Sequence, residues 1–261
     1  MKRLANLIGG EWLPPQDGQY FDDHNPATGA KIAEIPSSTA DDIEAAVAAA
    51  RAAQPAWGAL LPGERADWLE RIADALEARS AEIAELESRD TGKPVALARA
   101  VDAARSVLNF RFFAEMGREL PDEQYLMEDA LNVVVRKPVG VAGLITPWNL
   151  PLYLLSWKVA PAILMGNTVV AKPSRLTPLT ANLLAEVVTE AGLQYLTLDG
   201  HASMGALWWM SNERFMAMPE DMRRVVVDGF YQLQQATFAS PKRKSIPAYE
   251  EFVQGGGDLY V

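Results

Sequence analysis

Cysteine is absent from this 261-residue chain, and histidine is scarce. Without cysteine the chain can form no disulfide, and it offers no thiolate as a metal ligand or as a catalytic nucleophile. The two histidines, His24 and His201, lie too far from other candidate ligands in the sequence to suggest a zinc site. The composition therefore excludes a disulfide-stabilised scaffold and cysteine-based catalysis by this chain, and it predicts no metal site.

The sequence also lacks an excess of positive charge and a long apolar run near its start. Its formal net charge is −10, divided as −8 over residues 1–193 and −2 over residues 194–261. Neither part has the basic composition of a nucleic-acid-binding surface. The opening residues, MKRLANLIGGEWLPP, lack the apolar core of a signal peptide. We therefore expect a cytoplasmic protein that binds neither nucleic acid nor membrane.

What the sequence does contain is a strand–helix–strand pattern between residues 139 and 174. The run VGVAGLI at 139–145 is apolar throughout, which is typical of a strand buried on both faces of a parallel sheet. The turn TPWNLP follows, and Pro151 suits the first position of a helix because its missing N–H has no intrahelical partner there. We expect Gly166 to end this helix and a second buried strand to occupy about 168–172.

This pattern predicts where polar side chains gather. A strand, a helix and a strand so closely spaced form a right-handed crossover, which makes the strands parallel and places their carboxyl ends at the same edge. Open parallel sheets bind ligands at that edge. Thr146 to Asn149 and Lys172 to Ser174 should therefore face one crevice, and they supply a hydroxyl, an indole, an amide and an ammonium group. Such a set suits a polar cofactor next to a carbonyl substrate.

Three ordered motifs carry a family resemblance. They are NPATGAKIAEIP at 25–36, SRDTGKPVALARAVDAARSVLNFRFFAE at 88–115, and PVGVAGLITPWNLPLYLLSWKVAPAILMGNTVVAKPS at 138–174. Over about residues 7–193 the chain resembles the aldehyde dehydrogenase superfamily, in particular the branch that oxidises 2-hydroxy- and 2-aminomuconic semialdehydes. The resemblance implies an α/β domain at 1–193, with a partial Rossmann-like parallel sheet and covering helices. It also implies an NAD(P)-dependent oxidation of an aldehyde, here a semialdehyde, to a carboxylate.

The resemblance assigns roles to individual residues. It implies that Asn149 hydrogen-bonds the substrate oxygen as negative charge develops on it, in an oxyanion hole. The residues before Asn149 resemble the wall beside the nicotinamide and its ribose, and Lys172 resembles the lysine that binds the adenosine ribose. The cofactor would be NAD or NADP, and the substrate a small-molecule aldehyde. The cofactor-binding positions implied are Ile145, Thr146, Pro147, Trp148, Lys172, Pro173, Ser174 and Arg175.

Two departures from the family limit what this chain is expected to do. The family position of Arg175 is usually a glutamate that accepts hydrogen bonds from ribose hydroxyls; an arginine cannot accept them, although it could bind a 2′-phosphate and favour NADP. The family reaction also needs a thiolate and a glutamate-activated water, and the pyrophosphate-binding glycine turn is not found after Leu193. We therefore expect a dehydrogenase truncated within its coenzyme domain, inactive alone, in which Asn149 is vestigial.

Residues 195–261 resemble a different class of protein. The stretches MPEDMRRVVVDGF and AYEEFVQGGG are similar to the C-terminal part of periplasmic solute-binding proteins of tripartite (TRAP-type) transporters. A mainly helical segment is expected at 194–261, with one helix that starts at Pro219 and ends at Pro241. The alternative function is therefore a non-enzymatic binding or interaction protein, or a fusion product joined near 192–195.

Three helices and an exposed arm are predicted around the sheet. The first helix is capped by Thr39 in a capping-box pattern, the second starts near Pro62, and the third runs over about 94–116. The arm at about 122–137 contains a hairpin strand at 131–136. The expected buried positions are Ile43, Val47 and Ala50 in the first helix, Leu69, Ile72 and Leu76 in the second, and Val101, Leu108 and Phe112 in the third.

A parallel sheet that stops after this crossover would also leave an unpaired strand edge and an uncovered apolar face. A homo-oligomer could form through that edge.

Simpler interpretations of the site residues stay open at this point. Asn149 could cap the helix that follows it, Lys172 could be a solvated charge at a strand end, and Arg175 could be a surface substitution. In the tail, Trp208 and Trp209 with the nearby methionines could form core or an exposed apolar face instead of a ligand cage.

Overall fold

The computed structural model describes residues 2–120, 123–192 and 196–198. Contacts within the chain divide it into two units, Met1–Met204 and Gly205–Val261. The second unit lies outside the described residues, and so do the helix predicted from Pro219 and the rest of the predicted helical tail beyond Leu198.

The first unit is built around a mixed five-stranded sheet with the strand order β3-β2-β10-β9-β8. Its parallel part consists of β8 (Val141–Ile145), β9 (Thr168–Lys172) and β10 (Leu196–Leu198). The strands β2 (Asn6–Ile8) and β3 (Glu11–Leu13) extend it in antiparallel orientation. The α/β class is confirmed, but the predicted parallel sheet is only one part of a mixed sheet, because residues near the start of the chain pair with β10.

The strand β8 is less buried than its apolar sequence predicted. It pairs with β9 alone among the described strands, every residue of it keeps partial or full exposure, and Ile145 is 49% exposed. In contrast, β9 has a neighbour on each side and buries Thr168, Val169 and Ala171. The apolar run does form a strand, but a place at the edge of the sheet leaves it open to solvent.

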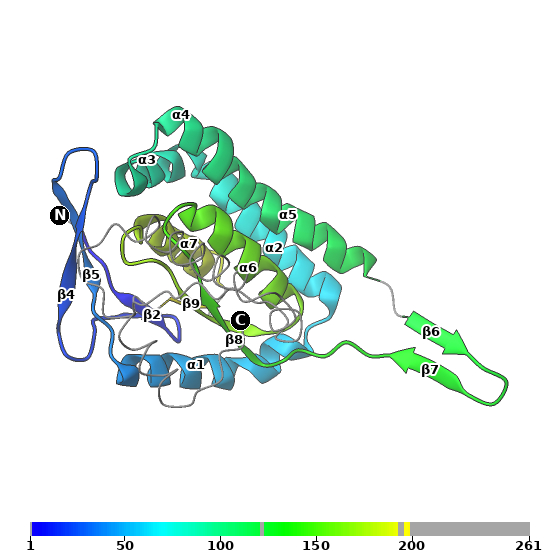
Figure 1. Ribbon diagram of the computed structural model, residues 1–261. Coiled ribbons are helices and arrows are strands. Elements are labelled where there is room, and N and C mark those ends of the chain that lie inside the picture. Colours follow the sequence, from blue (N-terminus) through cyan, green and yellow to red (C-terminus); the bar gives the residue numbers. More distant parts are fainter. Residues whose placement is uncertain (1, 121–122, 193–195, 199–261) are drawn as a thin grey trace, which may run out of the picture. The chain divides into compact units, whose positions relative to one another are not determined.

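Helices cover both faces of this sheet (Figure 1). The helix α1 (Ala40–Ala59) packs on one face, opposite α6 (Pro151–Leu164) and α7 (Leu179–Glu190). Outside α6, the helices α2 (Pro62–Ala78) and α5 (Ala104–Glu119) pack against each other as a further layer. The largest side chains of the core include Leu7, Trp57, Leu69, Ile72, Leu76, Phe110, Leu152, Leu155, Ile163 and Leu183.

The first two predicted helices are confirmed. The Thr39 Oγ1 atom accepts a hydrogen bond from the Asp42 amide, and an Asp42 carboxylate oxygen accepts one from the Thr39 amide, so the capping box is present. The second helix starts at Pro62, and its three predicted core residues are all fully buried. In α1 Ala50 is buried as predicted, but Ile43 and Val47 are only half-buried, and Ala46 and Trp57 face the core instead.

The third predicted helix is interrupted, and its buried face was predicted wrongly. It consists of α4 (Val95–Ala98), a π-helical turn η1 (Arg99–Ala103) and α5. A π turn contains an extra residue, so it rotates the face of the helix that follows it. The predicted core residues Leu108 and Phe112 are 53% and 56% exposed, and the buried residues of α5 include Val107, Phe110 and Ala114 instead.

Two helices of the structure had no counterpart in the sequence prediction. They are α7 and α3 (Ser80–Thr91), which precedes the interrupted helix. Gly92 ends α3 in the left-handed region at φ +76°, a backbone conformation that side chains disfavour. In the same way Gly166, at φ +82°, follows the end of α6, as the sequence predicted.

Two small sheets complete the unit. The strands β6 (Glu123–Leu126) and β7 (Leu131–Val134) form an antiparallel hairpin with largely exposed side chains, where the arm strand was predicted. Near the start of the chain, β1 (Lys2–Arg3) pairs in parallel with β5 (Lys31–Pro36), which pairs in antiparallel with β4 (Tyr20–His24).

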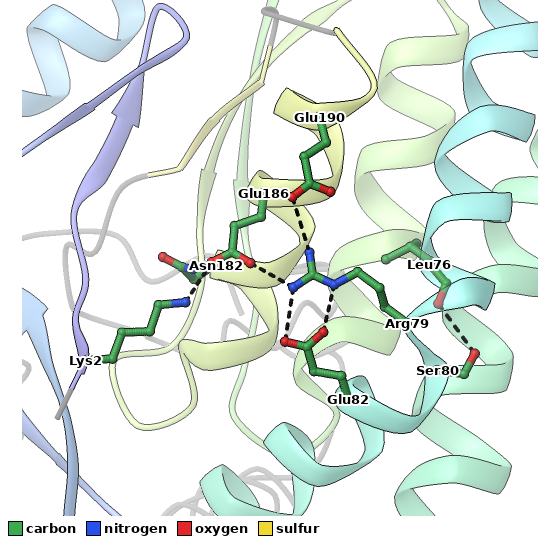
Figure 2. Close-up of polar contacts among 8 residues, drawn as sticks. All are labelled: Lys2, Leu76, Arg79, Ser80, Glu82, Asn182, Glu186 and Glu190. Atoms are coloured by element: carbon green, nitrogen blue, oxygen red, sulfur yellow. Dashed lines mark hydrogen bonds and ion pairs between the residues drawn. The ribbon is translucent and has the colours of Figure 1, made fainter.

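Arg79, at the junction of α2 and α3, ties these helices to α7 (Figure 2). Its guanidinium donates hydrogen bonds to Glu82 in α3 (2.8 Å) and to Glu186 in α7 (2.9 Å). Glu186 also accepts a hydrogen bond from Lys2 in β1 (2.7 Å). Burial acts to raise the pKa of Glu186, but the hydrogen bonds from Lys2 and Arg79 outweigh burial and lower it. This ionic link therefore connects β1, α3 and α7.

Candidate functional site

The two strand ends predicted to form one site are adjacent in the structure. The strands β8 and β9 pair in parallel with Ile145 opposite Lys172. The pairing continues one step beyond the strands, where the Thr146 amide donates a hydrogen bond to the Lys172 carbonyl oxygen (3.2 Å). Residues 146–149 and 172–175 therefore begin at the same edge of the sheet, as the crossover predicted.

The first turn, residues 146–150, combines one buried hydroxyl with exposed groups. Thr146 is only 1% exposed, and its Oγ1 atom has no hydrogen-bond partner among the described residues. Trp148 is 52% exposed, and Asn149 is exposed as well. Since buried hydroxyls are nearly always hydrogen-bonded in folded proteins, the Thr146 hydroxyl is a group for which a ligand could supply a partner.

Asn149 does not cap the helix that follows it. The N-cap position of α6 is Leu150, whose side chain makes no capping hydrogen bond, and the Leu150 carbonyl accepts from the Leu154 amide (3.0 Å). The simplest structural explanation for an asparagine at this position therefore does not hold. Its amide lies in the turn between β8 and α6.

The second turn, residues 172–178, leads from β9 into α7. Lys172 is half-buried and Pro173 is buried. The Ser174 hydroxyl accepts a hydrogen bond from the Leu176 amide (3.2 Å), and the Ser174 carbonyl accepts one from the Thr177 amide (3.2 Å). Arg175 is exposed, and its guanidinium carbon lies 5.4 Å from the centre of the Phe21 ring. Serine thus shapes the turn and arginine lies on its outer side.

Two carboxylates behind these turns were missed by the sequence analysis. Glu87 Oε1 accepts hydrogen bonds from the Leu152 amide (3.0 Å) and from the Thr180 hydroxyl (3.0 Å). Asp90 Oδ2 accepts one from the Leu179 amide (2.8 Å). Glu87 is 0% exposed and Asp90 is 3% exposed, so each carboxylate lies inside the protein at the start of a helix that follows a site turn.

Burial and neighbouring acids change the protonation of these groups. Burial, with the Asp102 carboxylate nearby, raises the pKa of Glu87 to about 7, although Lys93 opposes this. Burial and repulsion from Asp23 raise the pKa of Asp90 to about 9. Lys93 donates to Asp102 (2.8 Å) and lies 3.8 Å from Glu87. The cluster therefore holds more acids than bases away from water, which favours the protonated form of Asp90 at neutral pH.

A signal for these residues was present in the sequence. Ile83, Glu87 and Asp90 have the spacing i, i+4, i+7 that places residues on one face of a helix, and Gly92 follows as a stop. Acidic residues that share a helical face with a core isoleucine indicate buried carboxylates.

No group of three or more histidine, cysteine, aspartate or glutamate residues in the described part of the chain is arranged to hold a metal ion. None of the helices in residues 2–120, 123–192 and 196–198 is long and apolar enough to cross a bilayer.

Comparison with known proteins identifies relatives over this unit. The family model described as "Aldehyde dehydrogenase family" matches residues 12–198. The 2-aminomuconic semialdehyde dehydrogenase of Mus musculus is 50% identical over 192 residues, which cover 73% of this chain and 39% of that protein. The 2-hydroxymuconic semialdehyde dehydrogenase of Pseudomonas sp. strain CF600 is 45% identical over 199 residues, 74% of this chain and 41% of the relative.

Solved structures agree with this relationship. An indole-3-acetaldehyde dehydrogenase variant from P. syringae, in complex with NAD+ and IAA, has a TM-score of 0.73 and 36% identity over 76% of this chain and 41% of its own. An E. coli enzyme described as NADP dependent has a TM-score of 0.74 and 34% identity over 77% of this chain and 42% of its own. Through residues 12–198, this chain belongs to the aldehyde dehydrogenase family.

Proposed function

We propose that this chain binds NAD or NADP at the sheet edge formed by the carboxyl ends of β8 and β9. The observation that carries the proposal is the parallel register with Ile145 opposite Lys172, which places both turns of the site at one edge. Open parallel sheets bind nucleotides at such an edge. Relatives with NAD+ bound or described as NADP dependent support both forms of the cofactor.

The residues at this edge fit the chemistry of the cofactor. The buried Thr146 hydroxyl has hydrogen-bonding capacity that no described residue uses, and the exposed Trp148 ring offers an apolar surface beside it. We assign Ile145, Thr146, Pro147 and Trp148 to the nicotinamide half. We assign Lys172, Pro173, Ser174 and Arg175 to the adenosine half. When bound, the nicotinamide ring supplies a hydride acceptor.

The family reaction, oxidation of an aldehyde to a carboxylate, is a proposal for the protein as a whole. This chain spans 39% and 41% of the two curated relatives, both of which are named for muconic semialdehydes. We propose a semialdehyde as the substrate, with the Asn149 amide donating to its oxygen. Because the chain contains no cysteine, it cannot supply the thiolate that attacks the aldehyde, and we propose that it does not oxidise aldehydes by itself.

Three further parts of the proposal concern location, assembly and the tail. We propose a cytoplasmic protein without nucleic-acid partners, consistent with its net charge of −10. The strand β8 has an open edge among the described strands, which supports self-association through that edge. The resemblance of residues 195–261 to TRAP-type solute-binding proteins stays a prediction.

Titration of the full chain with NAD and with NADP tests the proposed site, with tryptophan fluorescence as the signal. We expect saturable binding, and we expect Lys172→Ala to weaken it about tenfold, the equivalent of one charge-assisted hydrogen bond. Lys137→Ala, on the exposed connection beyond β7, is the matched control and should bind as the original chain does. Absence of saturation with both nucleotides would rule out the proposed function.

A further inference from the structure

Each turn of the candidate site ends at the start of a helix whose own N-cap residue offers no side-chain cap. The N-caps of α6 and α7 are Leu150 and Pro178, and neither makes a capping hydrogen bond. The first amides of a helix have no partner within that helix, so another group must accept from them or they lose a hydrogen bond on burial.

Both missing acceptors come from one helix. Glu87 accepts from the Leu152 amide of α6 at 3.0 Å, and Asp90 accepts from the Leu179 amide of α7 at 2.8 Å. The two acids are three residues apart in α3, so they lie on the same face of it. Glu87 also accepts from the Thr180 hydroxyl in α7, which joins it to both helices.

We propose that Glu87 and Asp90 are positioning residues, which act through the starts of α6 and α7 to set the two halves of the nucleotide site relative to each other. The effect on nucleotide affinity rests on the proposed function. The hydrogen-bonded link between α3 and the two helices does not.

Each of the two acids contacts the helix starts through only one of its carboxylate oxygens. The second carboxylate oxygen of each acid, Glu87 Oε2 and Asp90 Oδ1, is buried and has no hydrogen-bond partner among the described residues. Glu87 Oε1 and Asp90 Oδ2 therefore make the hydrogen bonds to the helix starts, while Glu87 Oε2 lies 3.8 Å from the Lys93 ammonium. A carboxyl oxygen accepts from a helix N–H in either protonation state, and the hydrogen bond from the Leu179 amide acts to lower the pKa of Asp90 against the larger effect of burial.

Amide NMR spectroscopy of the full chain tests the link without requiring a disruptive variant. We expect the Leu152 amide resonance to shift with a titration that Glu87→Gln removes, and the Leu179 resonance to shift with one that Asp90→Asn removes. Glutamine and asparagine keep an acceptor oxygen, so both amides should stay protected from hydrogen exchange in these variants. The proposal would be overturned if the pH titrations of the Leu152 and Leu179 amide resonances were the same in both variants as in the original chain.

Alanine variants, which remove the carboxyl group, then distinguish a local positioning role from a general effect on the stability of the fold. We expect Glu87→Ala to speed exchange of the Leu152 amide about tenfold or more, with Glu87→Gln restoring protection, as loss of a charge-assisted hydrogen bond implies. Glu85→Ala, at an exposed position of the same helix, is the control and should change neither amide. Equal acceleration throughout α3 and α6 would identify a merely structural role and contradict the proposal.

Titration with the two halves of the dinucleotide, nicotinamide mononucleotide and ADP-ribose, distinguishes a failure of the positioning roles from a failure of the proposed nucleotide site. Glu87→Ala should weaken binding of nicotinamide mononucleotide more than binding of ADP-ribose, because Glu87 accepts from a backbone amide only in α6 and reaches α7 through the Thr180 side chain alone. Asp90→Ala should do the reverse, because Asp90 accepts from the Leu179 amide at the start of α7. If the original chain binds neither nucleotide nor its halves, the proposed function fails while the NMR experiment still decides the link. If the original chain binds and the alanine variants bind equally well, the positioning roles are wrong.

Discussion

Arg175 is the residue of the candidate site whose chemistry bears most directly on a choice between NAD and NADP. Its guanidinium stacks 5.4 Å from the Phe21 ring centre, at the outer side of the turn that follows β9. Stacking uses the face of a guanidinium and leaves the N–H groups at its edge available to an anion. A 2′-phosphate is such an anion, whereas ribose hydroxyls that need an acceptor gain nothing from arginine.

We expect Arg175→Glu to lower affinity for NADP by about tenfold or more while affinity for NAD stays equal or rises, since the change removes a cation and adds a like charge near the 2′-phosphate. Parallel fluorescence titrations with both nucleotides measure the ratio. Arg99→Glu, exposed in the π-helical turn, controls for the change in net charge. A ratio that does not move would show that Arg175 does not contact the 2′-phosphate.

At the scale of one element, α5 shows the limit of a periodic pattern. A helix over 94–116 was correctly predicted from the spacing of its apolar residues, but its core face was not. The π-helical turn at Arg99–Ala103 changes the register, so Phe110 is buried and Phe112 is exposed. A pattern that assumes one uniform helix takes no account of the extra residue in such a turn, and here it placed the exposed Phe112 in the core.

The two phenylalanines of α5 should respond differently to the same substitution. Phe110→Ala removes a fully buried ring and should lower the free energy of unfolding by about 3–5 kcal/mol. Phe112→Ala removes a ring that is 56% exposed and contacts Phe113 edge to face, and should cost about 1 kcal/mol or less. Urea denaturation followed by circular dichroism measures both, and similar losses would place the buried face elsewhere.

For the whole molecule, we expect the buried acids to make the free energy of unfolding depend on pH. Glu87 and Asp90 lie in a cluster with Asp23, Asp102 and a single lysine, Lys93, within hydrogen-bonding distance of Asp102. Their pKa values are raised by folding, so the folded chain binds protons that the unfolded chain has released. Above the unfolded pKa the stability must therefore fall as pH rises. Glu186, with a lowered pKa, acts in the opposite direction at acidic pH.

The expected result is a loss of stability as pH rises through the interval between the unfolded pKa of Glu87, 4.5, and its folded pKa, about 7. Over that interval we expect the free energy of unfolding of the original chain to fall by roughly 3 kcal/mol relative to that of Glu87→Gln, since each pKa unit is worth about 1.4 kcal/mol. Urea denaturation of both proteins at several pH values checks this. A constant difference would show that Glu87 titrates alike in both states.

Sequence by itself determined the strand–helix–strand unit, the parallel order of its strands, the family and the positions of Ile145 to Asn149 and Lys172 to Arg175 at two strand ends. These features follow from local periodicity, proline and glycine signals and the fixed hand of the crossover, which act over short stretches of chain. Whether each site residue performs its proposed role stays a prediction.

Only the tertiary structure decided the exposure of β8, the buried face of α5 and the capping of two helices by Glu87 and Asp90. An apolar strand is buried only if other strands and helices cover it, and an acid caps a distant helix only if packing brings the two together. Such outcomes depend on contacts between residues 65 and 89 positions apart, as in Glu87 with Leu152 and Asp90 with Leu179. The spacing of Ile83, Glu87 and Asp90 can indicate that the acids are buried, but no local pattern identifies their partners, because hydrogen bonds across the fold are properties of the assembled elements.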